Sequence, residues 1–266
     1  MSGSYPRGLK QKTKPLPSLS NATADPVNDI TIGVGQAQIG SAIANVLAPF
    51  TKRLDAEWVK GDNQGGRFPG VALENNTYHV FLIRNGLGEV DGGFDTSVIG
   101  ANTPSGFTPK RICSILRLNN QIKGFIQIGA FFELKNISVA DVEGAFIPAI
   151  GALYRVSVPT GIKTIFRGIL SPGLSAVGSI LNVVIQSPSQ EPLTPSGADF
   201  ISPFKGSFST YHSGSFFTAA SGEVQVLTNT NGEVRMASSG AYSGAPLYST
   251  TLQPLGWVDL ELAGGF

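Results

Sequence analysis

Residues 78–95, YHVFLIRNGLGEVDGGFD, decide the fold class of this chain. The run 78–83 consists almost wholly of aromatic and branched apolar residues, which favour strands. It meets Asn85-Gly86, a pair typical of hairpin turns, and Asp91-Gly92-Gly93 follows a few residues later. The stretch therefore predicts a β-hairpin with a loop.

A second long hairpin is expected just downstream. Residues 111–118 alternate in type, and a strand would place Arg111, Cys113, Ile115 and Arg117 on one face. Asn119-Asn120 then predicts a turn into residues 122–134. Because residues 125–132 are densely apolar, we expect that strand to be covered on both faces.

The stretch before these hairpins leaves two alternatives open. Apolar residues at positions 39, 43, 46, 47 and 50 have helical spacing, whereas residues 52–58 alternate as in a strand. A short helix and an amphipathic strand are both compatible with this pattern.

The second half predicts short strands separated by Gly and Pro, at 153–158, 163–170, 179–187, 223–228, 234–238 and 257–262. Asn231-Gly232 is a strong hairpin signal between two of them. In the last strand, alternation would turn Val258, Leu260 and Leu262 inward and Asp259 and Glu261 outward. Such spacing is typical of a β-sandwich or jelly roll.

The expected fold is therefore all-β, with two β domains behind an extended N-terminal arm. We assign residues 1–29 to the arm, which is basic. Residues 30–150 are assigned to an N-terminal antiparallel β platform domain with its linker, and residues 151–266 to a C-terminal β-sandwich or jelly roll. The change of composition around residues 138–151, with Gly144 and Pro148, places the boundary.

Composition narrows the function classes. The chain has 266 residues, 33 of them Gly, with 19 Lys plus Arg, 18 Asp plus Glu and one Cys. A single Cys forbids an intrachain disulfide, and one Cys with two His is too few for a Cys/His zinc site. No apolar run is long enough for a membrane helix, and no apolar segment follows the basic N-terminus as in a signal peptide. We expect synthesis in a cytoplasm, no membrane insertion, no metal and no cofactor.

The basic residues are unevenly placed. Arg7, Lys10, Lys12 and Lys14 give the first 14 residues four positive charges and no negative one. Pro6, Pro15 and Pro17 prevent a regular element, and few apolar groups are present to bury. Such an arm cannot order itself, so we expect a neighbouring chain to hold it, and we expect that partner not to be a nucleic acid.

Signatures of catalysis are missing. Gly33 and Gly35 lack the third glycine of a dinucleotide-binding loop, since position 38 is Gln, and no Ser lies in a nucleophile elbow. His79 and Cys113 fall in apolar strands and are interpreted as core residues. Acidic pairs at 55/57, 91/95, 141/143 and 259/261 are interpreted as solvated strand faces, although paired carboxylates also serve glycosidases. We predict a protein without catalytic residues.

A positive feature is the grouping of aromatic and small hydroxyl residues in two stretches, 209–218 (STYHSGSFFT) and 241–250 (AYSGAPLYST). Rigid rings beside adaptable hydroxyls are common on surfaces that bind saccharides or protein epitopes. Tyr211, His212, Tyr242 and Tyr248 are therefore the candidate glycan- or receptor-binding residues. The alternative interpretation is that these rings belong to the core of the sandwich.

Five stretches together resemble a known family. They are LSNATADPVNDITIGVG (19–35), TKRLDAEWVKGDNQGG (51–66), TYHVFLIRNGLGEVDGGFDTS (77–97), PSGFTPKRICSI (104–115) and GFIQIGAFFEL (124–134). They are similar to a domain of tailed-bacteriophage virion proteins of the tail fibre or tail protein type. The resemblance covers most of the chain after residue 19 and implies a virion structural protein, a homotrimer, and no catalytic set.

These observations together predict a non-enzymatic tail fibre or tail-tip protein of a virion. Its arm would attach to other virion proteins through Arg7, Lys10, Lys12 and Lys14, and its C-terminal domain would meet a host surface polysaccharide. A head fibre or capsid decoration protein is the alternative of the same class. A glycan-active depolymerase is the alternative of another class, but the chain lacks the length and repeats of a parallel β-helix.

Overall fold

The structure is a computed structural model, and it describes residues 15–136, 139–145, 147–149, 151–174, 179–192, 205–212, 218–219, 221–241 and 248–263. The expectation of an all-β chain is confirmed, since one short helix is the only helix in these ranges. No helix in the described part is long and apolar enough to cross a membrane. Arg7, Lys10, Lys12 and Lys14 lie outside the described residues.

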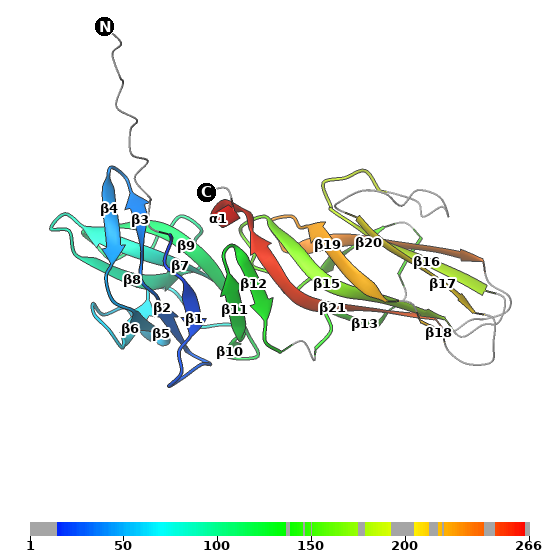
Figure 1. Ribbon diagram of the computed structural model, residues 1–266, viewed down its shortest axis with the longest axis horizontal. Coiled ribbons are helices and arrows are strands. Elements are labelled where there is room, and N and C mark those ends of the chain that lie inside the picture. The colour runs from blue at the N-terminus through cyan, green and yellow to red at the C-terminus, as the bar shows by residue number, and fades with distance from the viewer. Residues whose placement is uncertain are drawn as a thin grey trace, which may run out of the picture.

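The first sheet has eight strands and lies at one end of the molecule (Figure 1). Its order is β1 (Leu19–Asn21), β2 (Asp29–Ile32), β5 (Phe50–Glu57), β6 (Gln64–Arg67), β8 (Val90–Asp95), β7 (Asn76–Asn85), β9 (Phe107–Leu118) and β10 (Gln121–Ile122). The predicted hairpin is confirmed, because β7 and β8 pair antiparallel. β6 pairs parallel with both β5 and β8, so the expectation of a purely antiparallel sheet is wrong.

Glycine makes that parallel insertion possible. A Cβ on Gly65 would lie 1.8 Å from the carbonyl oxygen of Glu57, and one on Gly66 would meet the side chains of Lys52 and Phe94. Only residues without side chains allow β6 to lie between its two neighbours. Alternation patterns carry no signal for such a close approach.

The stretch with two open alternatives forms strands, and a helix there is wrong. β3 (Gly35–Ile39) and β4 (Ala42–Val46) make a separate two-stranded sheet. Gly40 has a φ of 59°, which lets the chain reverse between them. Ala37, Ile39, Ala44 and Val46 are buried, so one face of the hairpin packs on the body.

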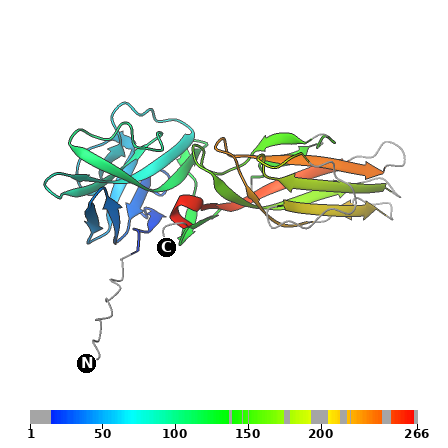
Figure 2. The ribbon, with the colours of Figure 1, turned by 90° about the horizontal axis from the view of Figure 1, so that it is seen from above.

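Two further sheets form the other end of the molecule (Figure 2). The second sheet has the order β11 (Phe125–Ile128), β12 (Phe131–Leu134), β21 (Tyr248–Asp259), β15 (Thr164–Leu174) and β18 (Thr218–Ala219), with β13 (Val142–Ala145) on β21 and β19 (Gly222–Leu227) on β15. The third has the order β14 (Ala152–Arg155), β20 (Glu233–Ala241), β16 (Ser179–Gln186) and β17 (Lys205–His212). Helix α1 (Leu260–Ala263) follows β21.

The second predicted hairpin is only partly correct. Asn119 and Asn120 have φ values of 54° and 60° and turn the chain as expected, but only β10 returns along β9. The next hairpin, β11–β12, pairs with β21 of the second sheet. Ile126 and Ile128 are about half exposed, so this segment is not covered on both faces.

The chain therefore passes from the first sheet to the second between Ile122 and Phe125. This point lies upstream of residue 150, where we placed the end of the first domain. The domain limits themselves stay a prediction.

The Asn231-Gly232 signal gives the turn without the hairpin. Gly232 has a φ of 70°, and the amide of Asn229 donates to the carbonyl of Glu233 at 3.2 Å. The two flanking strands then join different sheets, because β19 pairs with β15 and β20 pairs with β14 and β16. The expected hairpin ladder is absent from these described strands.

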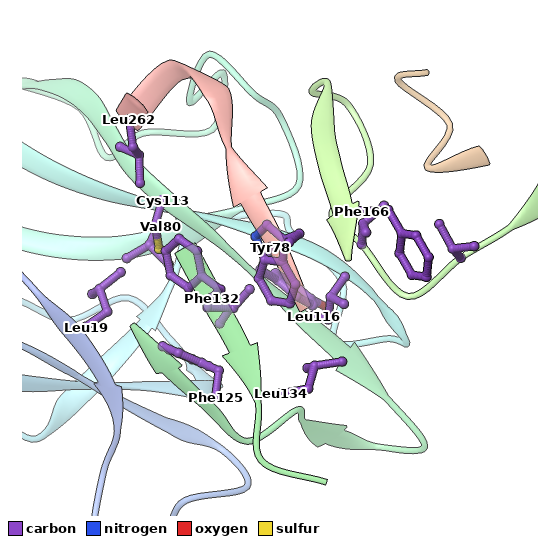
Figure 3. Packing of buried hydrophobic residues seen from close by; sticks show 14 of the residues in the cluster. Leu19, Tyr78, Val80, Cys113, Leu116, Phe125, Phe132, Leu134, Phe166 and Leu262 are labelled. Atoms are coloured by element: carbon purple, nitrogen blue, oxygen red, sulfur yellow. The ribbon is translucent and has the colours of Figure 1, made fainter. Parts of the chain in front are cut away.

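Buried side chains form a core cluster that continues across the sheets (Figure 3). Tyr78 and Leu116 of the first sheet and Phe125 and Phe132 of the second belong to it. The Phe132 ring stacks on Trp257, with centroids 5.2 Å apart and an interplanar angle of 4°. The apolar packing therefore extends through the place where the sheets meet.

Candidate functional site

The backbone register brings the candidate recognition residues to one end of the molecule. In the third sheet, Ile180 of β16 lies between Tyr211 of β17 and Ala241 of β20. In the second sheet, Tyr248 begins β21 opposite Leu174, the last residue of β15. We call this end of the two sheets the tip, and it is the end remote from the first sheet (Figure 1).

Tyr211, His212 and Tyr248 thus sit at strand ends of the tip. Tyr242 lies outside the described residues, directly after Ala241. The sequence singled out these four residues by composition alone. It gave no sign that two stretches 30 residues apart would reach the same end of the fold, because strand register decides that.

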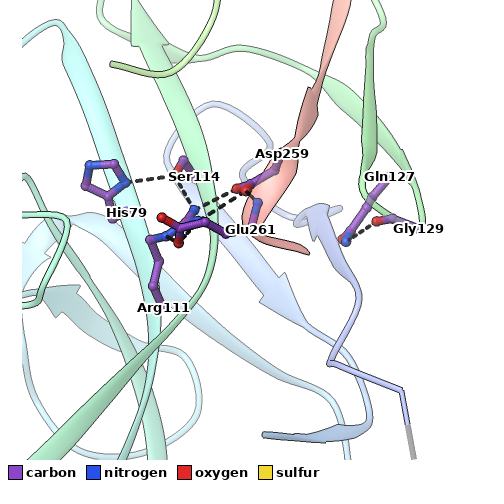
Figure 4. Close-up of polar contacts among 7 residues, drawn as sticks. All are labelled: His79, Arg111, Ser114, Gln127, Gly129, Asp259 and Glu261. Carbon is purple, nitrogen blue, oxygen red and sulfur yellow. Dashed lines mark hydrogen bonds and ion pairs between the residues drawn. The ribbon is translucent and has the colours of Figure 1, made fainter. Parts of the chain in front are cut away.

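A second cluster of polar residues lies where the first sheet meets α1 and β21. We call it the joint, and it consists of His79, Arg111, Ser114, Asp259 and Glu261 (Figure 4). The guanidinium of Arg111 donates to both oxygens of Asp259, at 2.6 and 3.1 Å. It also donates to the Glu261 carboxylate, at 3.2 Å from Nε, and to Ser114 Oγ at 3.0 Å.

A bulge in β9 makes this arrangement possible. The pairing of β7 with β9 shifts between Val80 and Phe81, whose partners are Cys113 and Arg111. The extra residue, Ile112, changes which way its neighbours face. Arg111 and Ser114 therefore contact each other, although regular alternation would place them on opposite faces of the strand.

The last strand, β21, also differs from the expected alternation of buried and exposed residues. Asp259, predicted to face solvent, is fully buried, and Glu261 lies in α1 rather than in a strand. Arg111 is also buried. Burial lowers the pKa of Arg111, but its hydrogen bonds and charge contacts with Asp259 and Glu261 outweigh this and raise it above the ordinary value.

The joint contains a Ser, a His and an Asp, and it is not arranged as a catalytic triad. His79 Nδ1 lies 2.7 Å from Ser114 Oγ, but the Asp259 carboxylate binds Arg111 instead of the imidazole. His79 and Ser114 are fully buried, and Gly161 lies so close to the imidazole that a Cβ added to it would be 3.3 Å from Nε2. Burial and the nearby Arg111 charge lower the pKa of His79 to about 4, which keeps the ring neutral.

His79 and Cys113 accordingly behave as core residues, as predicted. Cys113 is buried and unpaired, and burial raises the pKa of its thiol. Arg111 was not among the residues that the sequence singled out. Its signal was present, because Arg111 was placed on a strand face shared with Cys113 and Ile115, where a charge needs a partner.

The other acidic pairs divide into buried and exposed. Asp91 and Asp95 are buried, so the solvated interpretation is wrong for them. Asp91 pairs with Lys52 at 3.2 Å, and Asp95 accepts from the amides of Ser97 and Asn102. Asp55 is partly exposed and pairs with Arg53 on the surface. Each of these three carboxylates has a structural partner.

A groove of about 440 Å³ lies beside the joint. Its lining includes Lys110, Arg111 and Glu261, together with Leu16 and Leu262. Within the described ranges, no three or more His, Cys, Asp or Glu side chains are placed to hold a metal ion. No protein-family model and no curated protein matches this chain.

Proposed function

We propose that this chain is a non-enzymatic structural component of a tailed-phage virion, a tail fibre or tail-tip protein that takes part in host attachment. The observation that carries the proposal is the tip, where the positions of Tyr211 and Tyr248 and the neighbour of Tyr242 lie at strand ends on the same end of the molecule (Figure 1). Aromatic and hydroxyl residue types at backbone positions on the end of a β body would suit binding of a host surface polysaccharide.

The proposal gives each part of the chain a role. Residues 1–29 serve as the attachment arm, whose end is anchored in the first sheet by β1. Residues 30–150 serve as a platform, and residues 151–266 as the exposed binding domain. The family resemblance of residues 19–134 supports a virion role and a homotrimer. The low charge of the chain, 14% of its residues, suits a protein that buries surface against copies of itself.

The first experiment tests recognition. Replacing Tyr211, His212, Tyr242 and Tyr248 by Ala is expected to abolish binding of the labelled protein to host cells while leaving its melting temperature nearly unchanged. The matched control is Asn231→Ala, an exposed position in the turn at the opposite end of β20. Unchanged cell binding by the folded fourfold variant would show that the tip does not recognise the host.

The second experiment tests the place on the virion. Antibody against residues 151–266 should label the tail when virions are imaged. Label on the capsid would instead establish the head fibre or decoration protein. Absence of label from virions would refute the proposed function.

The third experiment tests the absence of catalysis. Pure protein incubated with host capsule or lipopolysaccharide should release no reducing ends. Release that disappears in Asp55→Asn or Glu57→Gln would establish a depolymerase instead.

A further inference from the structure

The hairpin β3–β4 carries an edge strand that is not protected. β3 and β4 form a sheet of their own, and β4 has no strand on its outer side among the described residues. Soluble proteins protect such edges with charges, prolines or bulges. β4 reads Ala-Ile-Ala-Asn-Val, with no charge and no proline, and its register to β3 is regular.

The direction of its backbone groups follows from a bond on the other side of the hairpin. The amide of Gln36 donates to the carbonyl of Pro15 at 3.0 Å, so the backbone N–H and C=O of Gln36 point away from β4. In an antiparallel pair, the backbone groups of its cross-strand partner Asn45 must then point away from β3. The same holds for the backbone groups of Ile43, two residues earlier. Two N–H and two C=O groups, those of Ile43 and Asn45, therefore face outward.

Side chains beside this edge are apolar and exposed. Ile43 is 54% exposed, and Leu47, two residues beyond Asn45 on the same outer face, is 81% exposed. By contrast, the edge strand β14 carries a charged residue, Arg155. The outer side of β11 is covered by β1, because the amide of Leu19 donates to the Gln127 side chain and the amide of Phe125 donates to the Asn21 side chain. The chemistry of the β4 edge therefore fits an extended strand with an uncharged side.

The described start of the chain shows how the arm meets this hairpin. Residues 15–18 run beside the chain at Gly33 and along the outer side of β3. The amide of Gly33, just before β3, donates to the carbonyl of Ser18 at 2.7 Å, and Gln36 of β3 donates to Pro15. Gly35 leaves room for them, since a Cβ there would lie 2.6 Å from the nitrogen of Pro17. The arm thus already pairs with one edge of the hairpin as an extended chain.

The sequence upstream of Pro15 is suited to the second edge. Residues 8–14, GLKQKTK, contain no proline and alternate Leu9, Gln11 and Thr13 with three lysines. These seven residues can span at most about 23–25 Å when extended, which is enough to pair along the β4 edge of a copy that lies beside the first.

We propose that residues 8–14 of one copy of this chain add as a strand to the β4 edge of a second copy. This inference rests on the proposed role of the arm, and it names the partner of the arm as the same chain. Pairing of unlike surfaces, arm on hairpin, closes a ring when the rotation between copies allows it, which provides a route to the proposed trimer.

Crosslinking of the full chain tests whether the arm crosses between copies. Single cysteines placed in turn at positions 10 to 13 are mixed under oxidising conditions with the Asn45→Cys protein; the native Cys113 is buried and does not interfere. A disulfide between the two different proteins is expected, and none with Asn231→Cys as the control. A protein that carries both cysteines, one at positions 10 to 13 and one at position 45, serves as the test for pairing within one chain. The proposal is overturned if mixing the single-cysteine proteins gives no disulfide, or if a disulfide forms only within one chain of the protein that carries both cysteines.

Light scattering of the full chain provides the second test. Asn45→Pro removes an outward N–H while leaving the bonds between β3 and β4, so we expect at least tenfold weaker association with the melting temperature nearly kept. Asn45→Ser, which keeps the N–H, should associate normally. Deletion of residues 1–14 should weaken association as much as Asn45→Pro. Because the deletion leaves β4 unchanged, its effect cannot come from a misfolded hairpin.

A monomeric full chain, or full association of both the deletion and Asn45→Pro, would overturn the arm exchange. Failure of the virion role is a separate outcome. Antibody label absent from virions, with the interchain disulfide present, refutes the virion function and leaves the exchange intact. Label on the tail without the disulfide does the reverse.

Discussion

Two buried cations hold this molecule in different ways. Lys52, in β5, donates to the carbonyls of Val59 and Gly61 at 2.7 and 3.1 Å and to Asp91 at 3.2 Å. All of these partners belong to the first sheet or its loops. Arg111, in β9, is bound by Asp259 and Glu261, which lie about 150 residues later, at the end of β21 and in α1.

The two ion pairs stabilise different parts of the molecule. Lys52 ties a loop to its own sheet, and burial lowers its pKa. Arg111 ties the first sheet to the end of β21 and to α1, across a boundary where the backbone passes only once, between Ile122 and Phe125, in the described structure. Loss of Lys52 should therefore weaken one sheet, whereas loss of Arg111 should weaken the coupling between parts.

The largest effect is expected for Lys52→Met. Asp91 would remain buried without its cation, and breaking a buried pair in this way typically costs about 3–5 kcal/mol. Urea unfolding should show this loss. Arg53→Met, one residue on, removes an exposed pair with Asp55 and should leave the urea midpoint almost unchanged. Equal effects of the two substitutions would contradict the distinction between buried and exposed cations.

A somewhat smaller effect, about 3 kcal/mol, is expected for Arg111→Met, which leaves Asp259 buried and uncompensated. Because the two ends of the molecule would no longer unfold together, we expect two unfolding transitions in place of one. Urea titration monitored by tryptophan fluorescence would detect this change. Adding Asp259→Leu should restore much of the loss. A single unchanged transition in Arg111→Met would show that apolar packing around Phe132 couples the parts without the joint.

The joint should also make stability depend on pH. The folded pKa of His79 is lowered from 6.5 to about 4, so between these values the unfolded chain binds a proton that the folded chain does not. His79 should therefore lower stability by about 2–3 kcal/mol as pH falls from 6.5 to 4, at 1.36 kcal/mol per pH unit, while Asp29 acts in the opposite direction over part of this range. Urea midpoints of the native protein and of His79→Gln across this range test it, because the difference between the two profiles isolates the contribution of His79. A slope unaffected by His79→Gln would assign the effect to other groups.

The smallest effect has the opposite sign and lies in the first sheet. Burial and the neighbouring charges of Asp25 and Asp55 raise the pKa of Asp29 to about 6, and one of its oxygens is buried without a hydrogen bond. The charged form is therefore unfavourable at pH 7, and Asp29→Asn should stabilise the protein by about 1–2 kcal/mol. The gain should vanish near pH 4, where Asp29 is protonated. Destabilisation at pH 7 would show that the carboxylate has a favourable role.

Much of the fold could be predicted because its signals are local. The strand run 78–83, the Asn-Gly turns and the positive-φ asparagines at 119 and 120 each depend on a few adjacent residues. The choice of partner strand could not be predicted in the same way. Nothing near Phe131 says that it will pair with Val258, and nothing near Asn231 says that its two strands will join different sheets.

The candidate site was predicted in part. Composition selected Tyr211, His212, Tyr242 and Tyr248, and strand register then gathered at the tip those backbone positions that the structure describes. Edge exposure at β4 is the opposite case. Its five residues look like any buried strand, and only the absence of a described neighbour on one side distinguishes it.

The all-β character of this chain and the places where it turns follow from short stretches of sequence, because alternation and turn chemistry act over a few residues. Which charges are buried depends on contacts between distant strands. Alternation turns Asp259 toward solvent and separates Arg111 from Ser114. A bulge at Ile112 brings Arg111 and Ser114 together, and the first sheet covers Asp259 from a distance of about 150 residues along the chain. A buried charge is stable only where a distant strand supplies its partner, and that partner does not lie within the local pattern.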